Sequence, residues 1–202
     1  MLSYCPRCGA EISRRSIGGR DRPACAAEGC TFVHFGDFSV GCAGVVTREI
    51  DGVTRALLIQ RGHEPYAGMW QIPGGYAEYD ELLSTAVVRE VREETGVVAD
   101  VADIIGVRHA LGGYQDGPST NVYVVFRLEY RSGEPRRDAE GEAARVGFFS
   151  LSQMKALDGL QGLTRWSVEQ ALRWEAGRGL RACAIDERSD TDHWALYGLG
   201  NG

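Results

Sequence analysis

From Phe38 onward, apolar residues come in short runs separated by turn-forming residues, which is the pattern of β-strands. The first two runs, FSVGCAGVVT at 38–47 and TRALLIQR at 54–61, lie on either side of Asp51-Gly52. This dipeptide favours a hairpin turn because both residues tolerate positive φ. Later runs of the same character cover 101–108, 121–130 and 145–151. The pattern predicts a β-rich domain with long polar loops at 109–120 and 131–144.

Two segments repeat their apolar residues with the period of an α-helix. The first helix is predicted over about residues 81–95, with Asp80 as its N-cap and Gly96 as its C-terminal stop. The second is predicted over about residues 164–176. From residue 179 to the end there is no clear period, so we expect an irregular tail there.

Three glutamates share one face of the first predicted helix. At 100° per residue, Glu90, Glu93 and Glu94 fall within an arc of about 100°. Like charges at these spacings destabilise a helix by roughly 0.2–0.5 kcal/mol per pair. One explanation is a solvated acidic face neutralised by Arg89 and Arg92. The other is a site for Mg²⁺ or Mn²⁺, which bind carboxylate oxygens and often complete their coordination with substrate phosphate oxygens.

Four of the six cysteines cluster near the N-terminus, in a segment without a long apolar run. Cys5-x2-Cys8 and Cys25-x4-Cys30 have the spacing of a Cys₄ zinc site, in which two turns each supply two thiolates. His34 is an alternative to one thiolate, and unbound reduced cysteines are the alternative to a metal. Four protein ligands leave no coordination position for water, so the predicted Zn²⁺ is structural.

Charge and composition narrow the class of protein. The 202-residue chain has a net charge of −6, which argues against broad electrostatic binding of nucleic acid. The cysteine-rich segment is locally basic, with arginines at positions 7, 14, 15, 20 and 22, and nucleic-acid binding there is an alternative that we do not favour. No apolar signal region and no run of roughly 18 apolar residues is present, so we expect a cytoplasmic protein without a membrane partner. We divide the chain into a cysteine module (1–35), a main domain (36–178) and a tail (179–202).

The acidic helix and the residues before it follow a defined spacing. Five residues separate Gly75 from Glu81, and seven separate Glu81 from Arg89-Glu90-Val91. One residue then separates this triplet from Glu93-Glu94, and one more separates that pair from Gly96-Val97. This arrangement resembles the motif of the Nudix hydrolases at every defining position. The resemblance begins at GMWQIPGG (68–75) and continues to about residue 150.

The resemblance implies an α/β fold, namely an α/β/α sandwich around a mixed β-sheet, with the cysteine module in front of it as a small zinc ribbon. It also implies divalent-metal-dependent hydrolysis of the pyrophosphate bond in a nucleoside diphosphate linked to another group.

The resemblance further assigns roles to residues of this chain. Glu90, Glu93 and Glu94, together with the Gly74 carbonyl, would hold catalytic Mg²⁺ or Mn²⁺. Glu81 and Arg89 would brace these acids in their working rotamers. Glu142 is the candidate general base, and Glu140 or a helix glutamate is the alternative.

A zinc ribbon before such a domain resembles the NADH pyrophosphatase branch and relatives that act on other dinucleotides. The Ser-Gln-Pro-Trp motif of that branch is absent between Val97 and Tyr130, whereas Tyr114 is placed as in diadenosine polyphosphate hydrolases. We therefore expect a nucleotide or dinucleotide substrate of the NADH, FAD, ADP-ribose or diadenosine polyphosphate type. The aromatic candidates for stacking on its base are Tyr66, Trp70, Tyr76 and Tyr114. A core position is the alternative for Trp70, and packing of the loop on the sheet is the alternative for Tyr114.

Two alternative functions stay open at this point. One is an RNA-end-processing pyrophosphohydrolase, in which the ribbon grips RNA. The other is a non-catalytic nucleic-acid-binding regulator on the same scaffold, although such a protein has no reason to keep three mutually repelling glutamates. A homodimer is common in similar proteins, and the sequence does not identify a pairing surface.

Overall fold

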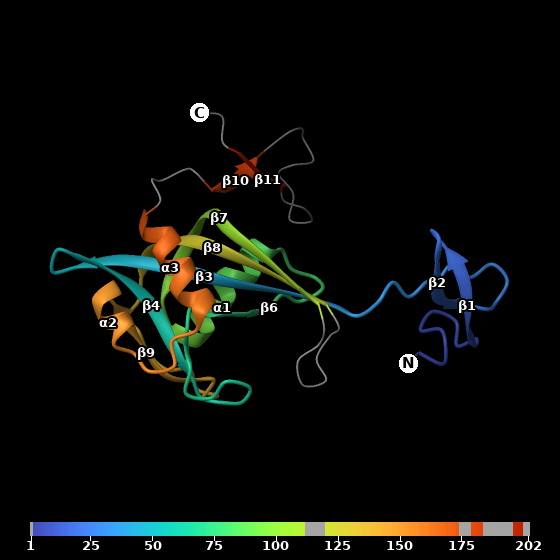
Figure 1. The fold of residues 1–202 in the computed structure, drawn as a ribbon, viewed down its shortest axis with the longest axis horizontal. Helices are drawn as coiled ribbons and strands as arrows, with labels where there is room; N and C mark the ends of the chain where they lie inside the picture. The colour runs from blue at the N-terminus through green and yellow to red at the C-terminus, as the bar shows by residue number, and fades with distance from the viewer. Residues whose placement is uncertain (1, 112–119, 174–178, 184–195, 200–202) are drawn as a thin grey trace. The chain divides into compact units, whose positions relative to one another are not determined.

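The computed structural model describes residues 2–111, 120–173, 179–183 and 196–199. The chain divides into two compact units, the first made of Met1–Phe38 with Leu111–Thr120 and the second of Ser39–Ala110 with Asn121–Gly202 (Figure 1). Within the described residues, no helix is long and apolar enough to cross a membrane.

The first unit is organised around a hairpin of β1 (Ile12–Ile17) and β2 (Arg20–Cys25). The two strands are antiparallel, with Ile17 opposite Arg20 and Ile12 opposite Cys25. Gly18 and Gly19 form the turn with φ of 60° and 75°, a conformation that glycine adopts without strain.

The second unit is built, within the described residues, on a nine-stranded sheet. In hydrogen-bonded order its main path is β11 (Leu196–Leu199), β10 (Leu180–Cys183), β7 (Val98–Leu111), β8 (Thr120–Ser132), β3 (Phe38–Ile50), β4 (Val53–Arg61) and β5 (Trp70–Gln71). Off this path, β6 (Gly74–Tyr76) pairs with β3, and β9 (Ala143–Phe149) pairs with β4. The predicted strand runs correspond to β3, β4, β7, β8 and β9, and the predicted hairpin turn is confirmed by φ of 53° at Asp51 and 72° at Gly52.

The sheet is mixed. The pairs β3–β4 and β4–β9 are antiparallel. The neighbours β3 and β8 start side by side, because Asn121 Nδ2 donates to Ser39 Oγ at 2.9 Å, so these two strands run in the same direction.

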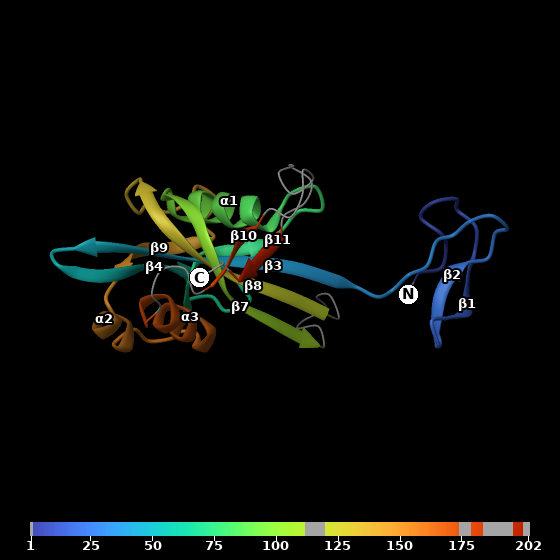
Figure 2. The ribbon, with the colours of Figure 1, turned by 90° about the horizontal axis from the view of Figure 1, so that it is seen from above.

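Helices cover both faces of this sheet, as Figure 2 shows. The helix α1 (Leu83–Thr95) lies on one face, and α2 (Leu151–Lys155) and α3 (Gly162–Arg173) lie on the other. Neighbouring residues of β3 point to opposite sides: Cys42 packs in the core that contains Val87 and Val91, and Ala43 packs in the core that contains Val168. The predicted α/β/α sandwich around a mixed sheet is therefore confirmed.

The start of α1 differs from the prediction. The helix begins at Leu83, and Leu82 is its N-cap without any side-chain hydrogen bond, so Asp80 does not cap it. The Glu81 carboxylate instead accepts a hydrogen bond from the Glu78 backbone at 3.0 Å, which forms a turn before the helix. The end of α1 is as predicted, because Gly96 adopts φ of 72° and its N–H donates to the Arg92 carbonyl.

The prediction of an irregular tail after residue 179 is wrong for two short segments. β10 and β11 pair antiparallel, and Leu180 of β10 lies opposite Ile104 of β7. Each strand has only four residues, too few to give a recognisable alternation. The short helix α2 also went unpredicted, although Ser150 and Gln153 form a capping box at its start.

Candidate active site

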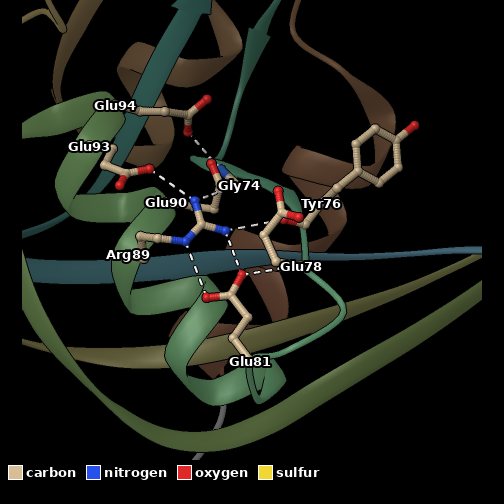
Figure 3. A network of polar contacts seen from close by, with 8 residues as sticks. All are labelled: Gly74, Tyr76, Glu78, Glu81, Arg89, Glu90, Glu93 and Glu94. Atoms are coloured by element: carbon tan, nitrogen blue, oxygen red, sulfur yellow. Dashed lines mark hydrogen bonds and ion pairs between the residues drawn. The ribbon is translucent and has the colours of Figure 1, made fainter.

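Arg89 of α1 is the centre of a polar network (Figure 3). Its Nη2 donates to Glu81 Oε1 at 2.7 Å and to the Tyr76 carbonyl at 3.2 Å. Its Nη1 donates to Glu90 Oε1 and to Glu93 Oε2, both at 2.9 Å. The hydrogen bonds between Arg89 and Glu81 lower the pKa of the Glu81 carboxyl and raise the pKa of the guanidinium. This is the geometry that the predicted bracing role requires.

Glu94 points away from this network and toward β6 (Figure 3). The Gly74 N–H donates to Glu94 Oε2 at 2.7 Å, and Glu94 is only 5% exposed. A Cβ on Gly74 would lie 2.2 Å from the Cys42 carbonyl oxygen, and a Cβ on Gly75 would lie 2.7 Å from the Glu90 carboxylate. Gly74 therefore lets β6 pass close to β3, and Gly75 lets it pass directly against the Glu90 carboxylate.

Glu94 is buried and Glu90 is partly buried, and neighbouring positive groups do not fully offset the cost of burying these carboxylates. Burial raises the pKa of Glu90, and the charges of Glu93 and Glu142 add to this rise against the opposing effect of Arg89. Burial raises the pKa of Glu94 to about 8, and the charges of Glu90 and Glu142 add to it although the Gly74 N–H opposes it. A cluster of this kind stabilises a divalent cation, which would supply the missing positive charge.

Glu142 comes to this cluster from the loop before β9. Its backbone N–H donates to Asp138 Oδ2 at 3.0 Å, and its carbonyl accepts from the Gly62 N–H at 2.7 Å. The side chain is exposed, yet its charge acts on Glu90 and Glu94. This placement suits a general base, and that role stays a prediction.

Beside these acids lies a cavity of about 280 Å³. Gly74 and Gly75 form part of its wall, together with the side chains of Tyr66 and Tyr76, two of the aromatic candidates. Two guanidinium groups also line it, Arg61 at the end of β4 and Arg108 of β7. The remaining lining residues are Pro65, Gln71, Ile72, Asn121, Tyr123, Gln161, Leu163 and Thr164.

The two arginines of the cavity are held in place. The Arg61 Nε donates to the Pro65 carbonyl at 2.8 Å, and the guanidinium is close enough to Glu94 to lower the pKa of that carboxyl. The Arg108 guanidinium lies over the Tyr123 ring at 5.0 Å and donates to Asn121 Oδ1. Carboxylates of this kind can bind a metal ion, and fixed guanidinium groups beside them can bind a phosphate group held by that ion.

The sequence analysis missed Arg61 and Arg108. Arg61 ends a predicted strand run, and Arg108 ends another, so both were interpreted as ordinary strand ends. Their shared cavity depends on the pairing of distant strands, which a single sequence does not specify. The signal that could have indicated these two site residues is a basic residue at the end of an apolar strand run.

Trp70 does not line the cavity. Trp70 is 3% exposed and packs edge-on against Phe149 with ring centroids 4.9 Å apart. Its ring is therefore part of the core and cannot stack on a base, which corrects the prediction. Tyr114 lies outside the described residues.

The four N-terminal cysteines form the second candidate site. Among the described residues, they are the one group of His, Cys, Asp or Glu whose ligand atoms all lie within 4.8 Å of one another. The Sγ atoms of Cys8 and Cys25 are 3.4 Å apart, and those of Cys5 and Cys30 are 3.8 Å apart. A tetrahedron with Zn–S bonds of about 2.3 Å has S–S edges of about 3.8 Å, so the four thiols can hold a metal ion of this kind.

Backbone N–H groups donate hydrogen bonds to two of these thiols. The Arg7 N–H donates to Cys5 Sγ and the Ala27 N–H donates to Cys25 Sγ, both at 3.4 Å. Burial raises the pKa of Cys5, but the Arg7 N–H and neighbouring groups outweigh this effect and bring the pKa to about 7. At Cys25 the Ala27 N–H lowers the pKa, but burial and the neighbouring thiols outweigh it and raise the pKa to about 12. His34, the alternative ligand, does not belong to this group of mutually close ligand atoms, and its Nε2 lies 3.5 Å from Asp37 Oδ1.

The fold and this pair of sites identify the class of protein. A family model described as NUDIX domain matches residues 39–169, which is well over half of the chain. The chain therefore belongs to the Nudix family.

Three known proteins illustrate the similarity. The chain is 33% identical over 112 residues to an ADP-ribose pyrophosphatase of Methanocaldococcus jannaschii, covering 54% of this chain and 64% of that protein. It is 29% identical over 175 residues to the NAD-capped RNA hydrolase NudC of Stutzerimonas stutzeri, covering 87% of this chain and 58% of that protein. The chain thus spans less than two thirds of these relatives. The fold resembles a crystal structure of a NUDIX hydrolase from Nitrosomonas europaea, with a TM-score of 0.67, 22% identity, and coverage of 85% of this chain and 91% of that one.

Proposed function

We propose that this chain hydrolyses the pyrophosphate bond of a nucleoside diphosphate linked to another group, with Mg²⁺ or Mn²⁺ as cofactor. The observation that carries the proposal is the juxtaposition of buried carboxylates and positioned guanidinium groups. Glu94 lies against the glycine pair of β6, and the same glycines line the cavity with Arg61 and Arg108. Carboxylates that can bind metal ions and guanidinium groups that can bind a phosphate therefore lie next to each other.

The residues that would hold the divalent ions are Glu90, Glu93 and Glu94, with the Gly74 carbonyl. When bound, these ions would polarise the pyrophosphate oxygens and favour deprotonation of an attacking water. The donor set fits them, because hard cations prefer carboxylate and carbonyl oxygens. Arg89 would keep Glu90 and Glu93 oriented through its two hydrogen bonds of 2.9 Å.

The cavity would bind and orient the substrate. Tyr66 and Tyr76 are 46% and 60% exposed, so their rings are accessible to a nucleobase. Arg61, next to Glu94, would donate to the pyrophosphate, and Arg108 would donate to a phosphate or ribose oxygen further along. Glu142 would accept the proton of the attacking water. In the first unit, the Cys₄ cluster would hold structural Zn²⁺.

The two relatives favour an adenosine diphosphate linked to a second group over a simple nucleotide as substrate. The printed names of these relatives include ADP-ribose and NAD-capped RNA, both of which contain an adenosine diphosphate linked to a second group. A second candidate function is removal of such a group from the 5′ end of RNA. It is favoured by the match to the NAD-capped RNA hydrolase, which covers 87% of this chain.

The test is phosphate release after phosphatase coupling, with Mg²⁺ or Mn²⁺ present. The panel is NADH, FAD, ADP-ribose, diadenosine polyphosphates, nucleoside triphosphates and an RNA with a 5′ NAD group. We expect turnover of at least one dinucleotide, and the preferred member separates the two candidates. A panel without any turnover in a folded, metal-loaded protein contradicts both candidates.

A further inference from the structure

The β1–β2 hairpin of the first unit places three arginines on one face. In its register Arg15 lies opposite Arg22, and Ile17 lies opposite Arg20. Residues two apart along a strand share a face, so Arg15, Arg20 and Arg22 all project from the same side. The acidic residue within these two strands, Asp21, lies opposite Ser16 and therefore belongs to the other side, with Arg14.

This basic face has no internal counter-charge. Among the described residues, none of the five arginines of the first unit forms an ion pair, whereas Arg48, Arg89, Arg127 and Arg131 in the second unit each do. Arg15 and Arg20 are exposed. Like charges directly opposite each other in a sheet are destabilising, so the pair Arg15 and Arg22 is a local cost in the unbound protein. An anion bound across the two strands would remove this cost.

An exposed aromatic ring extends the same face. Ala24 is bridged to Val33, so the chain after β2 runs alongside it and brings Phe35 beside Arg22. The Arg22 guanidinium lies 4.9 Å from the centre of the Phe35 ring, and Phe35 is 62% exposed. An aromatic ring of this size is normally covered in a folded protein, and a guanidinium stacked on it leaves one ring face accessible.

We propose that this face, made of Arg15, Arg20, Arg22 and Phe35, binds single-stranded nucleic acid. The three guanidinium groups would contact consecutive backbone phosphates, and a base would stack on Phe35. Guanidinium groups interleaved with aromatic rings are the usual means of binding single strands without sequence preference. An acidic peptide would satisfy the arginines but would leave the ring uncovered. The proposal is independent of the hydrolase function and goes beyond it.

The test is fluorescence anisotropy of the full chain, loaded with zinc, against labelled oligonucleotides of about 12 nucleotides. RNA and DNA of the same sequence are compared at several salt concentrations, without Mg²⁺ or Mn²⁺ so that hydrolysis does not interfere. We expect Kd to rise with salt, and removal of two phosphate contacts in Arg15→Gln/Arg22→Gln to lower the slope of log K against log salt by about 1.4. At about 0.1 M salt this corresponds to binding that is about 25-fold weaker.

Neighbouring residues supply the matched control. Arg14 and Arg15 are adjacent in sequence and lie on opposite faces of the hairpin, so Arg14→Gln removes the same charge from the other side. We expect Arg15→Gln to weaken binding about 5-fold and Arg14→Gln to weaken it less than 2-fold. Phe35→Ala should weaken binding with no change in the salt slope. Bound zinc is counted in every variant to confirm that the first unit is folded.

Several outcomes would overturn the proposal: no binding to either oligonucleotide, binding that does not depend on salt, or equal effects of Arg14→Gln and Arg15→Gln. Binding to RNA and DNA alike supports recognition by phosphates and stacking. Binding to RNA alone also supports it and adds a contact to the 2′-hydroxyl.

Discussion

The two ligand clusters of this protein differ in how far they are assembled. The four cysteine thiols already lie within 4.8 Å of one another. The helix glutamates do not converge in this way: Glu90 and Glu93 are bound by Arg89, and Glu94 is bound by the Gly74 N–H. Closed sites that only stabilise a fold need every ligand in place, whereas catalytic sites keep positions for water and substrate. The difference is consistent with the structural role that we propose for the first cluster and the catalytic role that we propose for the second.

The largest effect expected from this comparison is loss of the first unit on metal removal. Structural Zn²⁺ contributes roughly 10 kcal/mol or more to the folding of such modules. Cys25→Ser or a strong chelator should therefore unfold the β1–β2 hairpin and let trypsin cleave the chain after Arg14 and Arg15. The control is Cys42→Ala, because Cys42 is a buried core residue of the second unit. An unchanged trypsin pattern after verified metal loss would show that the first unit does not depend on its metal.

The next largest effect concerns Glu94. Glu94→Gln keeps the shape of the side chain and can still accept from the Gly74 N–H, but it removes the negative charge. We expect kcat/KM to fall by about 10³-fold, which corresponds to about 4 kcal/mol of transition-state stabilisation. The fold should be retained, as judged by the thermal midpoint. Activity within about 10-fold of the unmodified protein would remove Glu94 from the catalytic site.

A smaller effect is expected in the pH dependence of stability of the metal-free protein. The pKa of Glu94 is raised to about 8 from the ordinary value of 4.5, so the folded state binds a proton more tightly than the unfolded state does. Stability of the second unit is therefore greatest at low pH within this window and falls as pH rises from about 4.5 to 8, by up to roughly 5 kcal/mol. Mg²⁺ should restore it at pH 8, because the ion stabilises the ionised carboxylate.

Tryptophan fluorescence measures this dependence cleanly. All four tryptophans belong to the second unit, at positions 70, 166, 174 and 194. Glu94→Gln cannot titrate, so its unfolding free energy should change less between pH 5 and pH 8. A slope that persists in this variant would mean that another group, such as Glu90, causes it.

Both clusters were predictable from sequence for the same reason. Cys5, Cys8, Cys25 and Cys30 occur in two close pairs, and Glu90, Glu93 and Glu94 occur within one helical turn. Local spacing therefore specifies each set, because a turn or a helix converts it directly into proximity. The strands followed from their apolar runs for a similar reason.

The cavity was not predictable in the same way. Arg61 and Arg108 come from β4 and β7, which are not neighbours in the sheet, and Gln161 and Thr164 come from the start of α3. Their proximity arises from strand order and helix placement, which are non-local. Trp70 shows the converse error, because an aromatic residue next to a motif was assigned to the site although it fills the core.

The smallest expected effect tests whether Arg89 orients the glutamates of α1 through its hydrogen bonds or only supplies a positive charge. Arg89→Lys keeps the positive charge but replaces a planar fork, which donates to Glu81, Glu90 and Glu93, with a single ammonium. We expect activity to fall by about 10- to 100-fold and a higher concentration of Mg²⁺ or Mn²⁺ to be needed for half-maximal rate. The matched control is Arg92→Lys on the same helix, whose side chain is exposed and, among the described residues, forms no ion pair. Equal effects of the two variants would mean that the glutamates need only nearby charge. A specific effect at Arg89 would mean that its hydrogen bonds to Glu90 and Glu93 orient these carboxylates for the metal ions.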